Sequence, residues 1–242
     1  METKTYTSAV ERSGVDSGLR GFMIKVYNYM AAGLCLTALV AYLIVNTSLM
    51  SLFFNVDQAA GTVNLSGFGW LMLISPIIMA LVFNWVVAKG TASQTNAVFW
   101  LFSAIMGASL TPSLLMYTAS SMTRVFLITA AMFGAMSLYG YTTKRNLTGW
   151  GSFLIMGLWG IIIATVINIF MKSAGMYYAL SYIGVAIFVG LTAYDTQTIR
   201  DMYASSDNDD LLTKKAVSGA LSLYLDFINL FLYLLRLMGN RR

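Results

Sequence analysis

Seven long apolar stretches constrain this chain more than any other feature of its sequence. A helix needs about twenty mostly apolar residues to cross a bilayer, and each stretch meets or approaches that length. The stretches are Tyr27–Val45, Gly69–Ala88, Val98–Tyr117, Val125–Tyr141, Gly151–Phe170, Tyr177–Tyr194 and Ala216–Met238. The sequence therefore predicts an all-α integral membrane protein with seven transmembrane helices.

Composition supports the same class. Hydrophobic residues make up 58% of the 242 residues and charged residues only 10%, whereas soluble domains are about 25% charged. Lipid must therefore cover much of the surface. We expect residues 1–26 to form a cytoplasmic N-terminal tail and residues 27–242 to form one seven-helix transmembrane domain.

Basic residues predict the orientation of the helices, because cytoplasmic loops of membrane proteins are enriched in lysine and arginine. The N-terminal tail and the second, fourth and sixth connections hold ten of these residues, and the other three connections hold only Arg124 and Lys172. This distribution favours a cytoplasmic N-terminus. Arg236, Arg241 and Arg242 do not fit seven full crossings, so the sequence leaves open whether the last segment crosses conventionally.

The residues that the chain lacks exclude several kinds of chemistry. It has no histidine and a single cysteine, Cys35, so an internal disulfide and the usual cysteine and histidine metal sites cannot form. The net charge of +5 is explained by loop residues that orient membrane helices. We therefore expect no cofactor, apart from a permeant or bound ion, and no nucleic-acid partner.

Two aspartates are the strongest candidates for function, because acidic residues inside a bilayer are costly and usually functional. Asp195 closes the sixth apolar stretch, and Asp226 lies near the middle of the seventh. Polar residues around Asp226 recur at steps of three and four, which puts them on one helix face. This stripe consists of Gly219, Ser222, Asp226, Asn229, Tyr233 and Arg236. A hydrogen-bonded packing seam is the alternative explanation of the stripe.

A weaker stripe of the same kind lies on the sixth segment and consists of Ser181, Gly184, Phe188, Thr192 and Asp195. If the two stripes face each other, Asp195 and Asp226 approach. Two close carboxylates in a medium of low dielectric constant do not both ionise cheaply, so such a pair shares a proton. When deprotonated, it binds a hard cation through oxygen. Alternatively, Asp195 is a solvated helix cap that never meets Asp226.

The sequence around both aspartates resembles a known family. The run Ala193-Tyr194-Asp195-Thr196-Gln197, followed by Ile199, resembles the sixth-helix signature of the Bax inhibitor (TMBIM-type) membrane proteins. The run Leu223-Tyr224-Leu225-Asp226-Phe227-Ile228-Asn229-Leu230-Phe231 resembles the seventh-helix signature. The short tails are similar to those of bacterial members, which implies a bacterial inner membrane.

The resemblance implies six helices around a central seventh and a carboxylate pair, Asp195 with Asp226, that senses pH in a calcium leak pathway. Among the other residues of the two stripes, we expect Thr192, Ser222, Asn229 and Arg236 to support the pair. Bacterial members also place an arginine cluster at the end of the second helix, and one arginine latches onto the aspartates. Here no arginine lies between Arg20 and Arg124. Lysine provides a point charge rather than a bidentate fork, so the latch is weaker, absent or built from Lys89.

We therefore expect a pH-sensitive calcium leak channel, with Asp195 and Asp226 as ion ligands and with the lipid bilayer, Ca²⁺ or protons as partners. A regulatory or interaction protein of stress or cell-death pathways and a proton-coupled transporter remain alternatives. An enzyme is disfavoured. Asp226 lacks the Gly-x-Gly-Asp context of intramembrane aspartyl proteases. A retinal or other Schiff-base protein with seven helices is also disfavoured, because Lys214 and Lys215 lie at the mouth of the last helix rather than at its middle.

Overall fold

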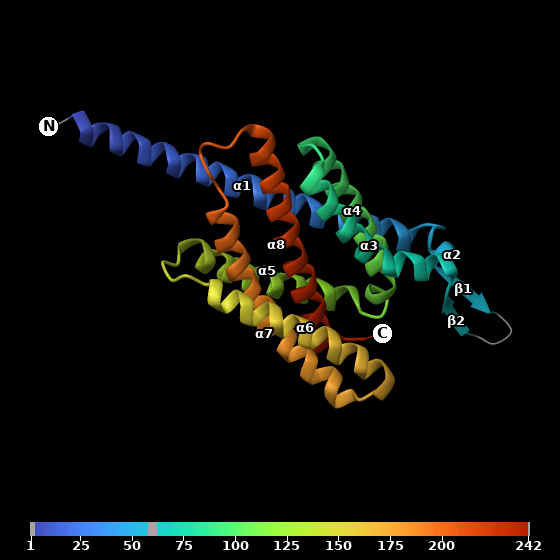
Figure 1. Ribbon diagram of the computed structural model, residues 1–242. Coiled ribbons are helices and arrows are strands. Elements are labelled where there is room, and N and C mark those ends of the chain that lie inside the picture. Colours follow the sequence, from blue (N-terminus) through green and yellow to red (C-terminus); the bar gives the residue numbers. More distant parts are fainter. Residues whose placement is uncertain (1–2, 58–61, 242) are drawn as a thin grey trace.

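The computed structural model describes residues 3–57 and 62–241 and consists of helices with one short hairpin (Figure 1). The helices are α1 (Thr3–Asn46), α2 (Met50–Phe53), α3 (Gly67–Lys89), α4 (Ala92–Leu114), α5 (Ala119–Thr142), α6 (Thr148–Met171), α7 (Ala174–Asp201) and α8 (Asp209–Met238), and the strands are β1 (Phe54–Asp57) and β2 (Thr62–Leu65). Every helix except α2 is long and apolar enough to cross a membrane, α1 through its Ser17–Asn46 part. The described residues thus contain seven candidate membrane-spanning helices, the number that the sequence predicts.

The helices extend beyond the apolar stretches at several boundaries, and the two largest differences lie in the N-terminal half of the chain. Helix α1 begins at Thr3, far before Tyr27. The apolar stretch missed this start, because apolar content marks where a helix enters lipid and not where the helix begins. The expected connection from Thr47 to Phe68 contains α2 and the antiparallel β1–β2 hairpin. Residues 1–2 of the expected tail, residues 58–61 of this connection and Arg242 lie outside the described residues.

Helix packing divides the bundle into inner and outer helices. Helix α8 packs against α1, α4, α5 and α7, whereas α3 packs mainly on α4, and α6 on α7. Figure 1 shows α8 running between the pair α1 and α4 and the pair α5 and α7. In an apolar stretch of 18 residues within α8, 56% of the residues are buried inside the protein. The corresponding share is 11% in α3 and in α6. The large apolar side chains of α3 and α6 accordingly face outward, toward lipid.

The basic connections gather at one end of the bundle. Lys25 Nζ donates to Thr213 Oγ1 at 2.8 Å, and Lys214 Nζ donates to the carbonyl of Gly90 at 2.8 Å. The Ala92 N–H donates to Asp210 Oδ1 at 3.1 Å. Lys25 of α1, the α3–α4 turn and the start of α8 therefore lie together at one end of the bundle.

The C-terminal residues lie at the opposite end, against the α4–α5 turn. The Thr118 N–H donates to the carbonyl of Asn240 at 3.1 Å, and Arg241 Nη2 donates to Tyr177 OH at 3.0 Å. Burial and the neighbouring Tyr177 raise the pKa of Tyr117, which also lies here. Helix α8 therefore runs the full length of the bundle, and Tyr177 binds Arg241, one of the three arginines that did not fit the charge pattern.

Close approaches of helix backbones depend on glycine at a few positions. A Cβ at Gly140 of α5 would overlap the carbonyl oxygen of Ala193 in α7, and a Cβ at Gly151 of α6 would overlap the ring of Tyr194. A Cβ at Gly160 of α6 would meet nothing within 4 Å. Gly140 and Gly151 thus bring α5 and α6 close to the segment of α7 that carries Asp195.

We predict that Gly140→Ala destabilises the protein, because the added methyl group meets backbone that cannot rotate away. The expected loss is about 1–3 kcal/mol, the usual cost of overpacking. Thermal unfolding of the purified protein in detergent measures this loss. Gly160→Ala is the matched control and should unfold at the wild-type temperature or above, since alanine favours helix over glycine. Equal unfolding temperatures for both variants would contradict the packing described here.

Candidate functional site

The two polar stripes meet where α7 packs against α8. A Cβ at Gly219 of α8 would lie 2.9 Å from Ile199 Cγ2, and a Cβ at Gly184 of α7 would lie 2.7 Å from Tyr233 Cε1. These two contacts fix an antiparallel register between the helices. In that register Asp195 lies opposite Ser222, one helical turn before Asp226.

Asp226 is a buried carboxylate without a compensating partner. Its residue is 4% exposed, and within the described residues its Oδ2 atom is buried and accepts no hydrogen bond. Asp195 is half-buried and acts on Asp226 through its charge. The described residues place no basic side chain in an ion pair with either aspartate. The two carboxylates are thus electrostatic neighbours in a site that does not neutralise them.

Residues next to Asp195 each have a structural role. Thr196 Oγ1 donates to the carbonyl of Thr192 at 2.7 Å. Gln197 holds the α5–α6 turn, because its Oε1 accepts from the Leu147 N–H at 2.7 Å and its Nε2 donates to the carbonyl of Arg145 at 2.8 Å. Structural contacts therefore explain the neighbours of Asp195 in this motif, and they leave Asp195 itself unexplained.

In the motif around Asp226, too, the neighbouring residues make structural contacts and the aspartate does not. Tyr224 is fully buried, shares a hydrogen bond of 2.6 Å with Thr37 of α1 and packs edge-to-face against aromatic rings of α4. Phe227 packs edge-to-face on Phe126 and Phe133 of α5, with ring centroids 5.4 Å and 5.5 Å away. These contacts anchor α8 to its neighbours, whereas the buried Oδ2 atom of Asp226 has no hydrogen-bond partner in the part of the chain that the structure describes.

The supporting residues of the stripes lie along the same interface but do not bind the carboxylates. Thr192 Oγ1 donates to the carbonyl of Phe188 at 2.7 Å, and Asn229 Nδ2 donates to the carbonyl of Leu225 at 2.8 Å. Ser222 is half-buried opposite Asp195.

Arg236 lies further along α8, toward its C-terminal end. Its guanidinium carbon is 5.1 Å from the ring centroid of Tyr233 and 5.8 Å from that of Tyr177. Cation–π contacts at such distances stabilise the charge. Arg236 therefore marks the end of the stripe, and ten residues of helix, about 15 Å, separate it from Asp226.

Lys89 lies away from the aspartates. It is the exposed last residue of α3, and the next residue, Gly90, accepts a hydrogen bond from Lys214 near the start of α8. Twelve residues of α8 separate Lys214 from Asp226, which is about 18 Å. Of the groups expected at the site, the fold brings Asp195 and Asp226 together and leaves Lys89 apart.

The two carboxylates are the metal ligands that this site offers. Among the described residues, no three or more cysteine, histidine, aspartate or glutamate side chains gather in a way that could hold a metal ion. Ca²⁺ takes six to eight oxygen ligands in tight protein sites. A cation at these two carboxylates would keep most of its water ligands.

One set of hydrogen bonds near the site was not predicted from the sequence. Ser137 of α5 lies between Tyr27 of α1, with oxygens 2.5 Å apart, and Thr196 of α7, with oxygens 3.0 Å apart. The three hydroxyls join three helices beside Asp195. A serine within an apolar helix is the only hint that the sequence gives, and it does not identify the partner.

Comparison with known proteins assigns the family. Residues 19–242 match the family model described as "Inhibitor of apoptosis-promoting Bax1". The chain belongs to this family. It is 45% identical over 229 residues to the inner membrane protein YbhL of Escherichia coli, with 93% of this chain and 94% of YbhL covered. It is 43% identical over 240 residues to protein RP147 of Rickettsia prowazekii, covering 99% and 98% of the two chains.

Family membership and the seven helices agree on the environment of the site. The protein is a multi-pass integral membrane protein, and its relative YbhL is an inner membrane protein by name. The matched region contains every residue of both stripes. The resemblance read from the two aspartate motifs is confirmed at the level of the family.

Because neither aspartate has a stabilising partner, we predict that Asp195→Asn and Asp226→Asn do not lower the unfolding temperature in detergent. Asparagine keeps the shape and removes a charge that is costly to bury. Gln197→Ala is the contrasting variant and should cost about 1–3 kcal/mol, since it leaves the buried Leu147 N–H unpaired. Loss of folding in both asparagine variants would show that the aspartates are structural.

Proposed function

We propose that the protein is a pH-sensitive leak channel for calcium and related cations, gated by Asp195 and Asp226. The observation that carries this proposal is the unpaired, buried carboxylate of Asp226 beside a second carboxylate. A charge in the membrane interior is costly unless it is paired or serves an ion pathway. The described residues supply no partner for the carboxylate of Asp226. In this proposal its partner is therefore an ion from solution.

Helix α8 is the central helix of the channel in this proposal. Its contacts with α1, α4, α5 and α7, and its large buried share, support that role. Helices α3 and α6 complete the ring from outside, through α4 and α7. A pathway along α8 is therefore shielded from lipid, as a route for charged species must be.

Protons and cations compete for the same oxygen atoms. When the pair holds a proton, its charge is too low to attract Ca²⁺. When it is deprotonated, two negative charges repel each other until a cation lies between them. The chain has no histidine, and the pKa of Tyr117 is raised further from neutrality. The carboxylate pair is therefore our proposed pH sensor.

The stripe provides the remaining polar groups of the route. Ser222 lies beside Asp195 in the helix register, and Asn229 follows Asp226 by one turn. Their oxygen atoms are ligands of the kind that hard cations accept. Asp226 itself is closed to solvent in this conformation, so we propose that conduction requires α7 and α8 to move apart. Chemistry on a substrate has no place in this proposal, which is for a non-enzymatic protein.

The test is Ca²⁺ flux into proteoliposomes, measured over a pH series. We expect the wild-type flux to change with pH and the flux of Asp226→Asn to be independent of pH. Asparagine mimics the protonated residue, so the variant should keep the low-pH flux of the wild type at every pH. Asp195→Asn should flatten the profile in the same way. The control is Asp201→Asn, which removes an exposed acid from the end of the same helix and should leave the profile unchanged.

Three outcomes would overturn the proposal. Wild-type pH dependence in both asparagine variants would exclude the carboxylate pair as sensor. A proton gradient driven by another solute, with no Ca²⁺ flux, would favour a proton-coupled transporter. Folded protein that conducts no ion at any pH would favour a regulatory role for this chain.

A further inference from the structure

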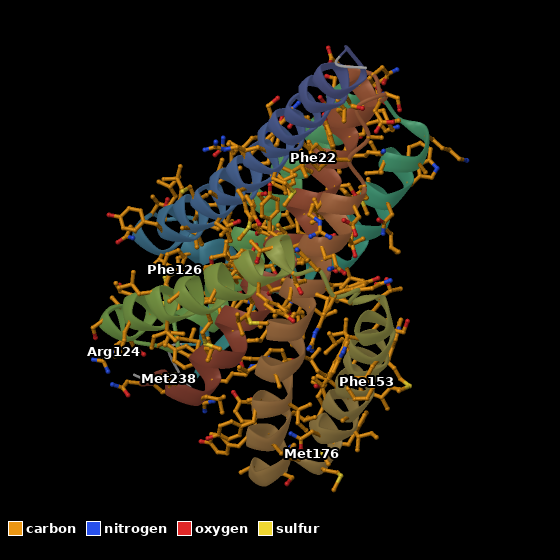
Figure 2. All side chains as sticks on the ribbon, turned by 90° about the vertical axis from the view of Figure 1, so that its left-hand side faces the viewer. Phe22, Arg124, Phe126, Phe153, Met176 and Met238 are labelled. Atoms are coloured by element: carbon orange, nitrogen blue, oxygen red, sulfur yellow. The ribbon has the colours of Figure 1, made fainter. Side chains whose placement is uncertain are left out.

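A lipid-facing cleft lies between α1 and α5, and its lining contains no residue of the two polar stripes. Its volume is about 510 Å³, within the range of about 300–1,000 Å³ that is usual for ligand pockets. It exists because α1 packs mainly on α4 and α8, and α5 mainly on α7 and α8. Figure 2 shows α1 and α5 side by side.

The cleft has a charged end and an apolar body. Arg20 lies at one end, near the start of the membrane-spanning part of α1. The walls continue with Ile24 and Tyr27 of α1 and with Gly134 and Leu138 of α5. From Arg20 to Tyr27 the helix rises about 10 Å, so the apolar part extends into the hydrocarbon layer.

Arg20 is exposed and makes no ion pair within the described part of the chain. A second guanidinium lies near this end, because Arg200 Nη1 donates to the carbonyl of Tyr141, another residue of the cleft. Asp201, the acid beside Arg200, is already paired with it. Among the described residues, Arg20 is therefore the exposed, unpaired positive charge at this end of the cleft.

We propose that this cleft binds an anionic phospholipid from the leaflet at the N-terminal end of α1. The headgroup phosphate lies at Arg20, and one acyl chain lies along the apolar walls. A groove that opens to lipid cannot stay empty, and charge complementarity selects an anionic headgroup over a zwitterionic one. A second cleft of about 350 Å³, further along the same two helices, has no charged residue in its lining and lacks this selectivity.

The inner wall of the cleft reaches the neighbourhood of the aspartates. Ser137 lines the cleft, and it bonds both Tyr27 and Thr196, the residue after Asp195. A bound chain covers these hydroxyls and fixes the distance between α1 and α5. Lipid binding does not depend on ion conduction, so the two proposals fail separately.

Native mass spectrometry of the full chain in detergent tests this proposal, with phosphatidylglycerol and phosphatidylcholine of identical acyl chains as probes. We expect the wild type to retain phosphatidylglycerol in preference to phosphatidylcholine. Arg20→Gln should weaken phosphatidylglycerol retention about fivefold, the factor for one basic group near an anionic headgroup. Gly134→Leu should abolish retention of both lipids, since a Cβ there meets nothing within 4 Å and the side chain fills the cleft.

Matched controls exist for both variants. Arg124→Gln removes an exposed arginine from the other end of α5, and Gly160→Leu adds the same bulk to open space on α6. Both should retain lipid as the wild type does. If Gly134→Leu does not fold, Ile24→Trp fills the cleft from the opposite wall.

Three results would overturn the proposal. Wild-type retention in Arg20→Gln and in the filled cleft would place the lipid elsewhere. Equal retention of the two headgroups by the wild type would exclude charge selection. Absence of retained lipid, or a dimer in which a second copy covers α1 and α5, would exclude a lipid as the occupant.

Discussion

The close packing of α7 on α8 is the interaction on which the rest of the structure depends. Glycine on each helix lets a large side chain of the other helix approach, with Ile199 over Gly219 and Tyr233 over Gly184. These contacts set the register that brings Asp195 and Asp226 within electrostatic reach. A shift by one residue would turn the polar stripe of α8 away from α7, because side chains on a helix rotate by about 100° per residue.

The surrounding helices hold this interface in place and keep it away from lipid. Tyr224 ties α8 to α1 through Thr37, and Phe227 ties it to α5. Gln197 ties α7 to the α5–α6 turn. Such directional contacts have a cost if they are broken. They stabilise a scaffold in which an unpaired carboxylate can persist, and this scaffold is what makes the proposed exchange of a proton for a cation feasible.

The number of helices and the two aspartates could be predicted from the sequence, because both depend on local composition. The length of an apolar stretch can be counted and compared with the thickness of a bilayer. An acidic residue in the middle of such a stretch can be identified in the same way. The start of α1 at Thr3 and the hairpin between α2 and α3 were not predicted, since hydropathy carries no signal for structure outside the lipid. The distance of Lys89 from the site depends on where the end of α3 packs. Spacing along the chain contains no information about that position.

The central claim is that Asp195 and Asp226 exchange a shared proton for a cation. The most direct measurement is proton release when Ca²⁺ is added to purified protein in weakly buffered detergent, followed with a pH-sensitive dye. The account predicts release of about one proton per chain from the wild type, as expected for two carboxylates that share a proton, and none from the Asp195→Asn, Asp226→Asn double variant. Equal release from the wild type and the double variant would contradict it.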